Sequence, residues 1–247
     1  MTQLLAIETT EKRGSIALSL DGKILLQYEL PDGQRSAQSL TPTIQTALWQ
    51  VDWPIKSLDA VAVALGPGSF TGLRIGLATG RMLAYAVDAK LLGVNTLQAI
   101  AANVCLTGDD EQVSKWQNGQ LVTTAVDAQR GEVSAQTFRM IPSRHFVGEL
   151  FPEPVDERRL LTFDAWWTLA DTQGGHLAFA GPVLSKIAAQ RPEAAQLLDE
   201  SLWSPNAGGV SRIAWERLFS GKSDDMLTLQ PYYSRPSAAE EKLGVRN

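Results

Sequence analysis

Residues 6–16 read Ala6-Ile7-Glu8-Thr9-Thr10-Glu11-Lys12-Arg13-Gly14-Ser15-Ile16, and residues 125–133 read Ala125-Val126-Asp127-Ala128-Gln129-Arg130-Gly131-Glu132-Val133. Each stretch combines an apolar run, a carboxylate, a short turn that contains Arg-Gly and a second apolar run, which is the pattern of a hairpin between two strands. The two acids, Glu8 and Asp127, are about half a chain length apart. This spacing predicts a duplicated chain whose halves face each other across a cleft, although chance similarity of two short hairpins is the alternative.

The first half alternates strands and helices in a regular order. The Asp21-Gly22 pair between two apolar runs is a tight-hairpin signal. Hydrophobic patterning predicts strands over residues 4–8, 15–20, 23–30, 60–65 and 90–94, and helices over residues 39–50, 70–87 and from residue 96. The half is therefore expected to read βββαβαβα.

The second half repeats this order less regularly. We expect strands over residues 121–127, 133–140, 145–151 and 176–181, and helices near residues 163–170, through residue 201 and over residues 210–219. A polar interruption at residues 107–119 separates the halves. We therefore expect an N-terminal domain over residues 1–107 and a C-terminal domain with a tail over residues 108–247, each large enough for a modest core.

Composition excludes several classes of function. The formal net charge is −5 and the arginines are scattered, whereas nucleic-acid binding needs concentrated cationic surface. The single cysteine, Cys105, rules out an internal disulfide and a zinc site built from thiolates. The N-terminal apolar run ends at Glu8, which predicts a cytoplasmic protein with no membrane segment.

A glycine-rich turn connects the strand that ends near residue 65 to the following helix. It reads Leu65-Gly66-Pro67-Gly68-Ser69-Phe70-Thr71-Gly72-Leu73-Arg74-Ile75-Gly76. Ser69 or Thr71 can cap the helix, whose N-terminus would favour an anion. The stretch lacks the Gly-Lys-Ser or Gly-Lys-Thr of a P-loop and a Gly-x-Gly-x-x-Gly pattern, so a structural turn is an equal alternative.

The helix that follows has small side chains on one face. Gly72, Gly76 and Gly80 recur every four residues, and each glycine costs up to about 1 kcal/mol relative to alanine in a helix interior. Such a face predicts close approach by another element. The pattern leaves open whether that element is the protein's own sheet or a second subunit.

This glycine-rich stretch closely resembles the most specific motif of the TsaB/YeaZ family. Residues 5–9 resemble the family's opening strand, residues 126–133 its second hairpin, and Pro231-Tyr232-Tyr233-Ser234-Arg235 its C-terminal Pro-x-Tyr-x-Arg. Two positions depart from the family pattern, because Glu8 stands where Asp is common and a histidine is replaced near Ser36. The resemblance covers nearly the whole chain.

The resemblance implies a two-domain actin-like (ASKHA, ribonuclease H-like) α/β fold. It also implies a non-catalytic role beside TsaD in forming threonylcarbamoyladenosine next to the anticodon of tRNAs that read codons beginning with A. The implied partners are a TsaD-type protein, a TsaE-type ATPase, a second copy of the chain when TsaD is absent, and tRNA only through the complex. No membrane partner is expected.

Family knowledge places the helices of residues 39–50 and 70–87 in an interface with TsaD or with a second TsaB. This favours a partner over the protein's own sheet on the glycine face. The interface residues expected on this basis are Gly68, Ser69, Phe70, Thr71, Gly72, Arg74, Gly76 and Gly80.

The main enzymatic rival is a free-standing actin-like ATPase or kinase, and a lesser rival is a homodimeric binding module unrelated to tRNA. The ATPase would use the two hairpin loops through Glu8, Thr9, Arg13, Asp127 and Arg130, with the acids around Mg2+. The first loop lacks the Asp-x-Gly form that brings backbone close to phosphate. We therefore expect no tightly bound cofactor, and place ATP or ADP with Mg2+, if bound, at an interface with TsaD.

A metalloprotease function is disfavoured. The chain has two histidines, His145 and His176, which are too far apart in sequence for His-x-x-x-His spacing. The family resemblance and these residues predict an accessory subunit without catalytic residues or a metal site.

Overall fold

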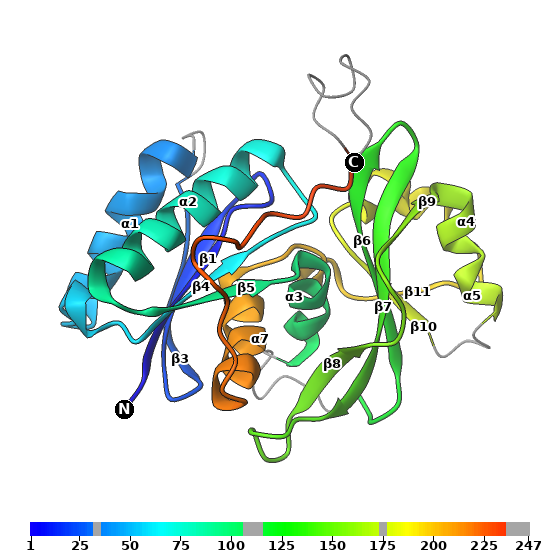
Figure 1. The fold of residues 1–247 in the computed structure, drawn as a ribbon. Coiled ribbons are helices and arrows are strands. Elements are labelled where there is room, and N and C mark those ends of the chain that lie inside the picture. Colours follow the sequence, from blue (N-terminus) through cyan, green and yellow to red (C-terminus); the bar gives the residue numbers. More distant parts are fainter. Residues whose placement is uncertain (32–35, 106–115, 173–176, 236–247) are drawn as a thin grey trace.

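The computed structural model describes residues 1–31, 36–105, 116–172 and 177–235. It has two lobes, each built around one β-sheet (Figure 1). The first sheet has the order β3-β2-β1-β4-β5, with β1 Gln3–Glu8, β2 Ser15–Leu20, β3 Lys23–Glu29, β4 Ala60–Ala64 and β5 Lys90–Val94.

The second sheet has the order β11-β10-β6-β7-β8, and β9 also pairs with β7. Its strands are β6 Leu121–Gln129, β7 Glu132–Pro142, β8 Leu150–Pro154, β9 Arg159–Thr162, β10 Leu177–Ala180 and β11 Gln196–Leu197. The α-helices are α1 Ser36–Gln50, α2 Phe70–Val87, α3 Thr96–Ala102, α4 Phe163–Trp167, α5 Leu169–Thr172, α6 Leu184–Ile187 and α7 Ala207–Phe219. Short 3₁₀ helices cover Ile55–Ser57, Asn103–Cys105, Ala188–Gln190 and Glu200–Leu202.

The two sheets have the same connectivity, which confirms the predicted duplication and the α/β fold class. In each lobe the first strand, β1 or β6, is central, with an antiparallel neighbour that follows it in sequence and a parallel neighbour on its other side. Both Asp21-Gly22 and Arg130-Gly131 form two-residue hairpins with both residues at positive φ. The second half is less regular because β9 is added and its helices are short.

The last helix of each half packs on the sheet of the other half. Helix α3 buries Leu97 and Ile100 against the second sheet, while α7 buries Val210 and Trp215 against the first sheet. The two helices also contact each other closely, since a Cβ on Gly209 would collide with the Ala99 carbonyl. The lobes are therefore interlocked, and the expected domain boundary between residues 107 and 108 lies outside the described residues.

Burial on both faces of the sheets explains their apolar strands. In β1, Leu5 and Ile7 face the core shared with α1 and α2, whereas Leu4 and Ala6 face the core shared with α7. Such two-sided burial produces continuous apolar runs rather than alternation. In the second lobe, Trp166 is fully buried and its Nε1 donates to Thr123 Oγ1 at 3.0 Å.

One predicted strand of the second half is wrong, and one observed strand was not predicted. The strand expected over residues 145–151 is a loop until β8 begins at Leu150, because the chain leaves the sheet after Pro142 and Phe146 packs against Gly22 of the first lobe. Strand β9 was not expected, because its four residues are largely exposed and show no apolar run. No helix in the described part of the chain is long and apolar enough to span a membrane.

Candidate functional site

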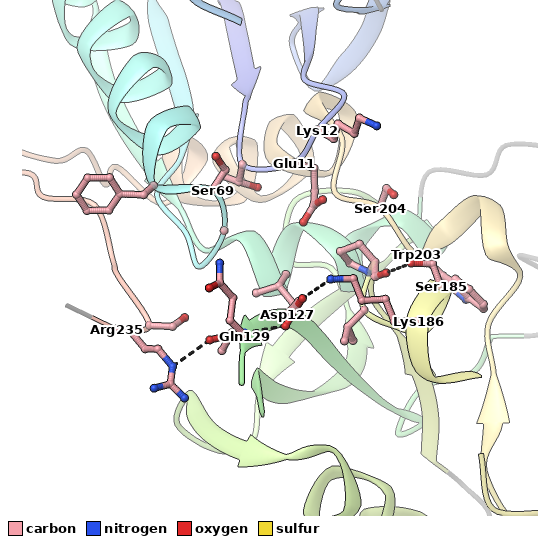
Figure 2. Close-up of a pocket in the computed structure, with 18 of the residues that line it drawn as sticks. Glu11, Lys12, Ser69, Asp127, Gln129, Ser185, Lys186, Trp203, Ser204 and Arg235 are labelled. Atoms are coloured by element: carbon pink, nitrogen blue, oxygen red, sulfur yellow. Dashed lines mark hydrogen bonds and ion pairs between the residues drawn. The ribbon is translucent and has the colours of Figure 1, made fainter. Parts of the chain in front are cut away.

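A cleft lies between the two lobes and encloses a cavity of about 1230 Å³ (Figure 2). The first lobe contributes residues 10–12 of the β1–β2 loop and residues 68–71 of the glycine-rich turn. The second lobe contributes residues 126–130 of the β6–β7 hairpin and residues of and around α6, while Tyr233, Ser234 and Arg235 close one rim. The two similar hairpins thus meet at the cleft, as their repetition predicts.

The glycine-rich turn is locked onto the β1–β2 loop. Ser69 N donates to the Thr10 carbonyl at 2.7 Å, and Ser69 Oγ caps α2 by accepting from Gly72 N at 3.2 Å. Gly68 leaves no room for a side chain, since a Cβ there would lie 2.5 Å from Thr10 Cβ. Two amides that could bind an anion at the helix start are therefore already bonded within the protein, which favours the structural-turn interpretation.

The glycine face of α2 packs on the protein's own sheet, so the expectation that it faces a partner is wrong. A Cβ on Gly72 or Gly76 would collide with Thr9, and one on Gly80 would collide with Val63. Thr9 Oγ1 also donates to the Gly72 carbonyl at 2.8 Å. The three glycines allow α2 to lie close to β1 and β4, which offsets their unfavourable helix propensity.

The opposite face of α2 is accessible along its whole length. We call the stripe Thr71, Arg74, Ala78, Met82 and Tyr85 the outer stripe of α2; its members are all exposed and recur at helical spacing. Met82 and Tyr85 are 69% and 81% exposed, which is unusual for large apolar side chains. Of the expected interface residues, Ser69, Thr71 and Arg74 are exposed and Gly68 and Phe70 are half-buried.

The expected acid of the first hairpin does not face the cavity. Glu8 is fully buried, and its Oε1 accepts hydrogen bonds from Thr10 N and Thr10 Oγ1, both at 2.5 Å. Burial raises the pKa of Glu8 to about 8, which favours the protonated form of the side chain in the folded protein. Arg13 also lies away from the cavity and forms an exposed ion pair with Glu29 at 3.2 Å. Thus Glu8, Thr9 and Arg13 do not line the cleft, because Glu8 and Thr9 are buried, Thr9 against the glycine face of α2, and Arg13 is exposed beside Glu29.

Of the charged side chains that line the cleft, Glu11, Asp127 and Lys186 interact with one another. Lys186 Nζ lies 2.5 Å from Asp127 Oδ2, and Asp127 Oδ1 accepts from Gln129 N at 2.7 Å (Figure 2). Hydrogen bonding and attraction to Asp127 raise the pKa of Lys186. Burial is the largest cause that raises the pKa of Glu11, with a further contribution from the Asp127 charge. Asp127 and Arg130 thus lie at the cleft as expected, whereas Lys186 carried no signal in the hairpin pattern.

This donor set does not suit a magnesium–nucleotide complex held by this chain alone. Asp127 is already neutralised by a lysine, and the second acid, Glu8, is buried and favours its protonated form. Among the described residues, no three Asp, Glu, His or Cys side chains gather closely enough to hold a metal ion. His145 instead lies 3.8 Å from Glu216 Oε2, and His176 lies outside the described residues.

Comparison with known proteins identifies a group of similar chains. The family model described as "TsaD: tRNA N6-adenosine threonylcarbamoyltransferase" matches residues 33–159, about half of the chain. The tRNA threonylcarbamoyladenosine biosynthesis protein TsaB of Escherichia coli K12 is 29% identical over 248 residues, with 98% of each chain covered. TsaB of Bacillus subtilis 168 is 29% identical over 130 residues, which cover 53% of this chain and 52% of the relative.

The fold also matches a solved structure over nearly its whole length. The structure of YeaZ from Pseudomonas aeruginosa superposes with a TM-score of 0.74 at 24% identity and covers 94% of this chain and 100% of that chain. The two-lobed architecture is therefore the fold of that structure.

Proposed function

This chain belongs to the TsaB/YeaZ family, and on that premise we propose that it is a non-catalytic partner of a TsaD-type protein in the formation of threonylcarbamoyladenosine. The modified base lies next to the anticodon of tRNAs that read codons beginning with A. The chain scaffolds or activates the TsaD-type transferase, and it reaches tRNA only through that complex, consistent with its net charge of −5.

The observation that carries this proposal is the outer stripe of α2. Helix α2 uses its glycine face for its own sheet and leaves Met82 and Tyr85 exposed on a regular stripe along the helix. Helix α1 lies beside α2 and exposes Trp49 by 83% (Figure 1). Exposed large apolar side chains on two neighbouring helices are typical of a surface that packs against another protein.

The cleft disfavours the rival of a free-standing ATPase or kinase. The Lys186–Asp127 ion pair stands where that activity would need a metal-binding acid, and Glu8 is withdrawn into the core. We therefore place ATP or ADP with Mg2+, if they take part, at the interface with the TsaD-type protein. A TsaE-type ATPase is the second partner of the complex.

The outer stripe also offers a surface for a second copy of the chain when the TsaD-type protein is absent. One surface that serves both associations makes the homodimer and the heteromer mutually exclusive. A homodimeric binding module without a role in tRNA modification remains the alternative that uses the same surface.

The test is complex formation measured by size-exclusion chromatography with light scattering. The chain is mixed with the TsaD-type protein of its own organism, and the variant Met82→Glu/Tyr85→Glu is compared with Val147→Glu, which places a charge on a fully exposed loop residue of the other lobe. We expect a heteromer with the wild type and Val147→Glu, and separate proteins with the double variant. A heteromer that forms equally well with the double variant would refute this interface, and no heteromer with the wild type would refute the proposed function.

A further inference from the structure

After α7, the chain runs back along the first lobe and is bound to it by an ion pair and hydrogen bonds. Arg217 forms an ion pair with Asp224 at 2.8 Å, and Asp224 Oδ2 accepts from Gly93 N at 2.6 Å on the edge strand β5. Further along, Arg81 of α2 donates to the Leu229 carbonyl. The segment that precedes Pro231 is therefore part of the first lobe.

Residues 231–235 then leave the first lobe and run to the tip of the β6–β7 hairpin (Figure 1). Tyr232 N donates to the Leu65 carbonyl at 2.7 Å, which ties the backbone to the first lobe. The ring of Tyr232 stacks against the Arg158 guanidinium of the second lobe, whose Cζ is 3.6 Å from the ring centroid. One residue thus contacts both lobes.

The next residues contact the two lobes in alternation. The Tyr233 ring lies 4.6 Å from the Phe70 ring, and its hydroxyl accepts from Arg74 Nε at 3.1 Å, so Tyr233 is held by the first turns of α2. Arg235 lies on the other side of the cleft rim (Figure 2), where its Nε donates to the Ala128 carbonyl at 2.9 Å. Its guanidinium also pairs with Glu132. Residues Ala128 and Glu132 flank the turn of the β6–β7 hairpin.

A second contact between the lobes lies at the opposite end of the molecule. The ring of Phe146, in the β7–β8 loop, packs against Gly22 in the β2–β3 turn and beneath the guanidinium of Arg212 on α7. A Cβ on Gly22 would collide with this ring, so the contact is close. The lobes are therefore joined at both ends, with the cleft at the end where residues 231–235 cross.

We propose that Pro231–Arg235 is a clasp that holds the two lobes at a fixed separation and couples the start of α2 to the β6–β7 hairpin. Its contacts alternate between lobes, so any opening of the cleft must break the Arg235 contacts or pull Tyr233 away from Phe70 and Arg74.

The clasp also connects the proposed partner surface to the cleft. Arg74 belongs to the outer stripe of α2 and bonds directly to Tyr233. Two residues further along the chain, Arg235 holds the hairpin that carries Asp127 and Arg130. A change in the position of Arg74 is therefore transmitted to the hairpin through a five-residue segment.

The first test measures the separation of the lobes in the full chain. Spin labels are placed at exposed positions in α1 and α4, Gln45→Cys and Asp164→Cys, in a Cys105→Ala background, and the distance distribution is recorded by double electron–electron resonance. We expect one narrow distribution in the wild type and a broader, longer one in Tyr233→Ala/Arg235→Ala. Arg13→Ala, which removes an ion pair within the first lobe, is the matched control and is expected to keep the narrow distribution.

The second test measures amide hydrogen exchange by residues 128–132 of the hairpin. We expect exchange at least about tenfold faster in Arg235→Ala, and only partly slowed again by the charge exchange Arg235→Glu/Glu132→Arg, which restores the ion pair but not the hydrogen bond to the Ala128 carbonyl. Retained secondary structure by circular dichroism shows that the variants fold. Unchanged lobe distances in the double variant, or hairpin exchange that is insensitive to Arg235, would overturn the proposal.

Discussion

Lys186 Nζ lies 2.5 Å from Asp127 Oδ2 inside the cleft between the lobes. Asp127 lies two residues before the end of β6, the strand that corresponds to β1 in the duplication, and Lys186 lies on α6, the first helix after β10. The ammonium group therefore supplies, within the chain, the positive charge that a cleft acid would otherwise take from a bound cation.

Removing the Lys186 ammonium group should lower the stability of the folded protein slightly. For Lys186→Met we expect a loss of about 0.5 kcal/mol in the free energy of unfolding, because an ion pair this exposed is largely screened by water. The loss should shrink at high salt and should vanish in the Asp127→Asn background. Urea unfolding of the four variants of this cycle measures it, and a loss that is equal in both backgrounds would contradict a direct interaction.

The cleft should not respond to magnesium. We expect no rise in the melting temperature of the wild type on addition of Mg2+ with ATP, and no phosphate release by the purified chain, because Asp127 is neutralised by Lys186. Thermal unfolding and a phosphate assay check both points. Phosphate release that is lost in Asp127→Asn would establish the ATPase alternative instead.

The buried Glu8 should make stability fall as pH rises. Its folded pKa of about 8 lies above the ordinary value of 4.5, so between these values the folded protein holds a proton that the unfolded chain has released. We expect Glu8→Gln to remove this slope and to gain at least about 1 kcal/mol relative to the wild type on going from pH 5 to pH 8.

Urea unfolding at the two pH values provides the measurement for this prediction. Glu153→Gln, which removes one acid from the exposed surface of β8, is the matched control and should leave the slope in place. An identical pH dependence in Glu8→Gln and the wild type would show that Glu8 is ionised in the fold.

Enlarging the glycine face of α2 should destabilise the fold, because this face packs inside the protein. Gly76→Leu would drive its side chain into Thr9 and Ile7, with an expected loss of about 2 kcal/mol in the free energy of unfolding. Ala78→Leu on the exposed outer stripe is the matched change and should be nearly neutral. Thermal unfolding compares them, and a stable Gly76→Leu variant would mean that α2 does not rest on β1 as described.

Local sequence determined most of the elements. Helix α2 begins at Phe70 and β5 covers Lys90–Val94 as predicted, because a capping serine and a bounded apolar run are signals carried by adjacent residues. The duplication could also be predicted from the sequence, since the two hairpins repeat the same arrangement of strand, acid and turn. Strand β9 could not be predicted, because three of its four residues are exposed and the segment shows no alternation of apolar and polar residues.

The sequence by itself determined which residues can meet, whereas only the tertiary structure decided which of them do. The glycine repeat predicted close packing of α2 against another element, but not which element. The contact of α2 with β1 and β4 joins residues that are far apart in the sequence, and the spacing of the glycines does not specify it. Likewise, only the folded structure shows that Glu8 is buried and that Lys186, on a helix distant in sequence, forms an ion pair with Asp127. Sequence periodicity reflects residues that are close along the chain, whereas the charges that meet in a cleft belong to residues that are close only in the folded structure.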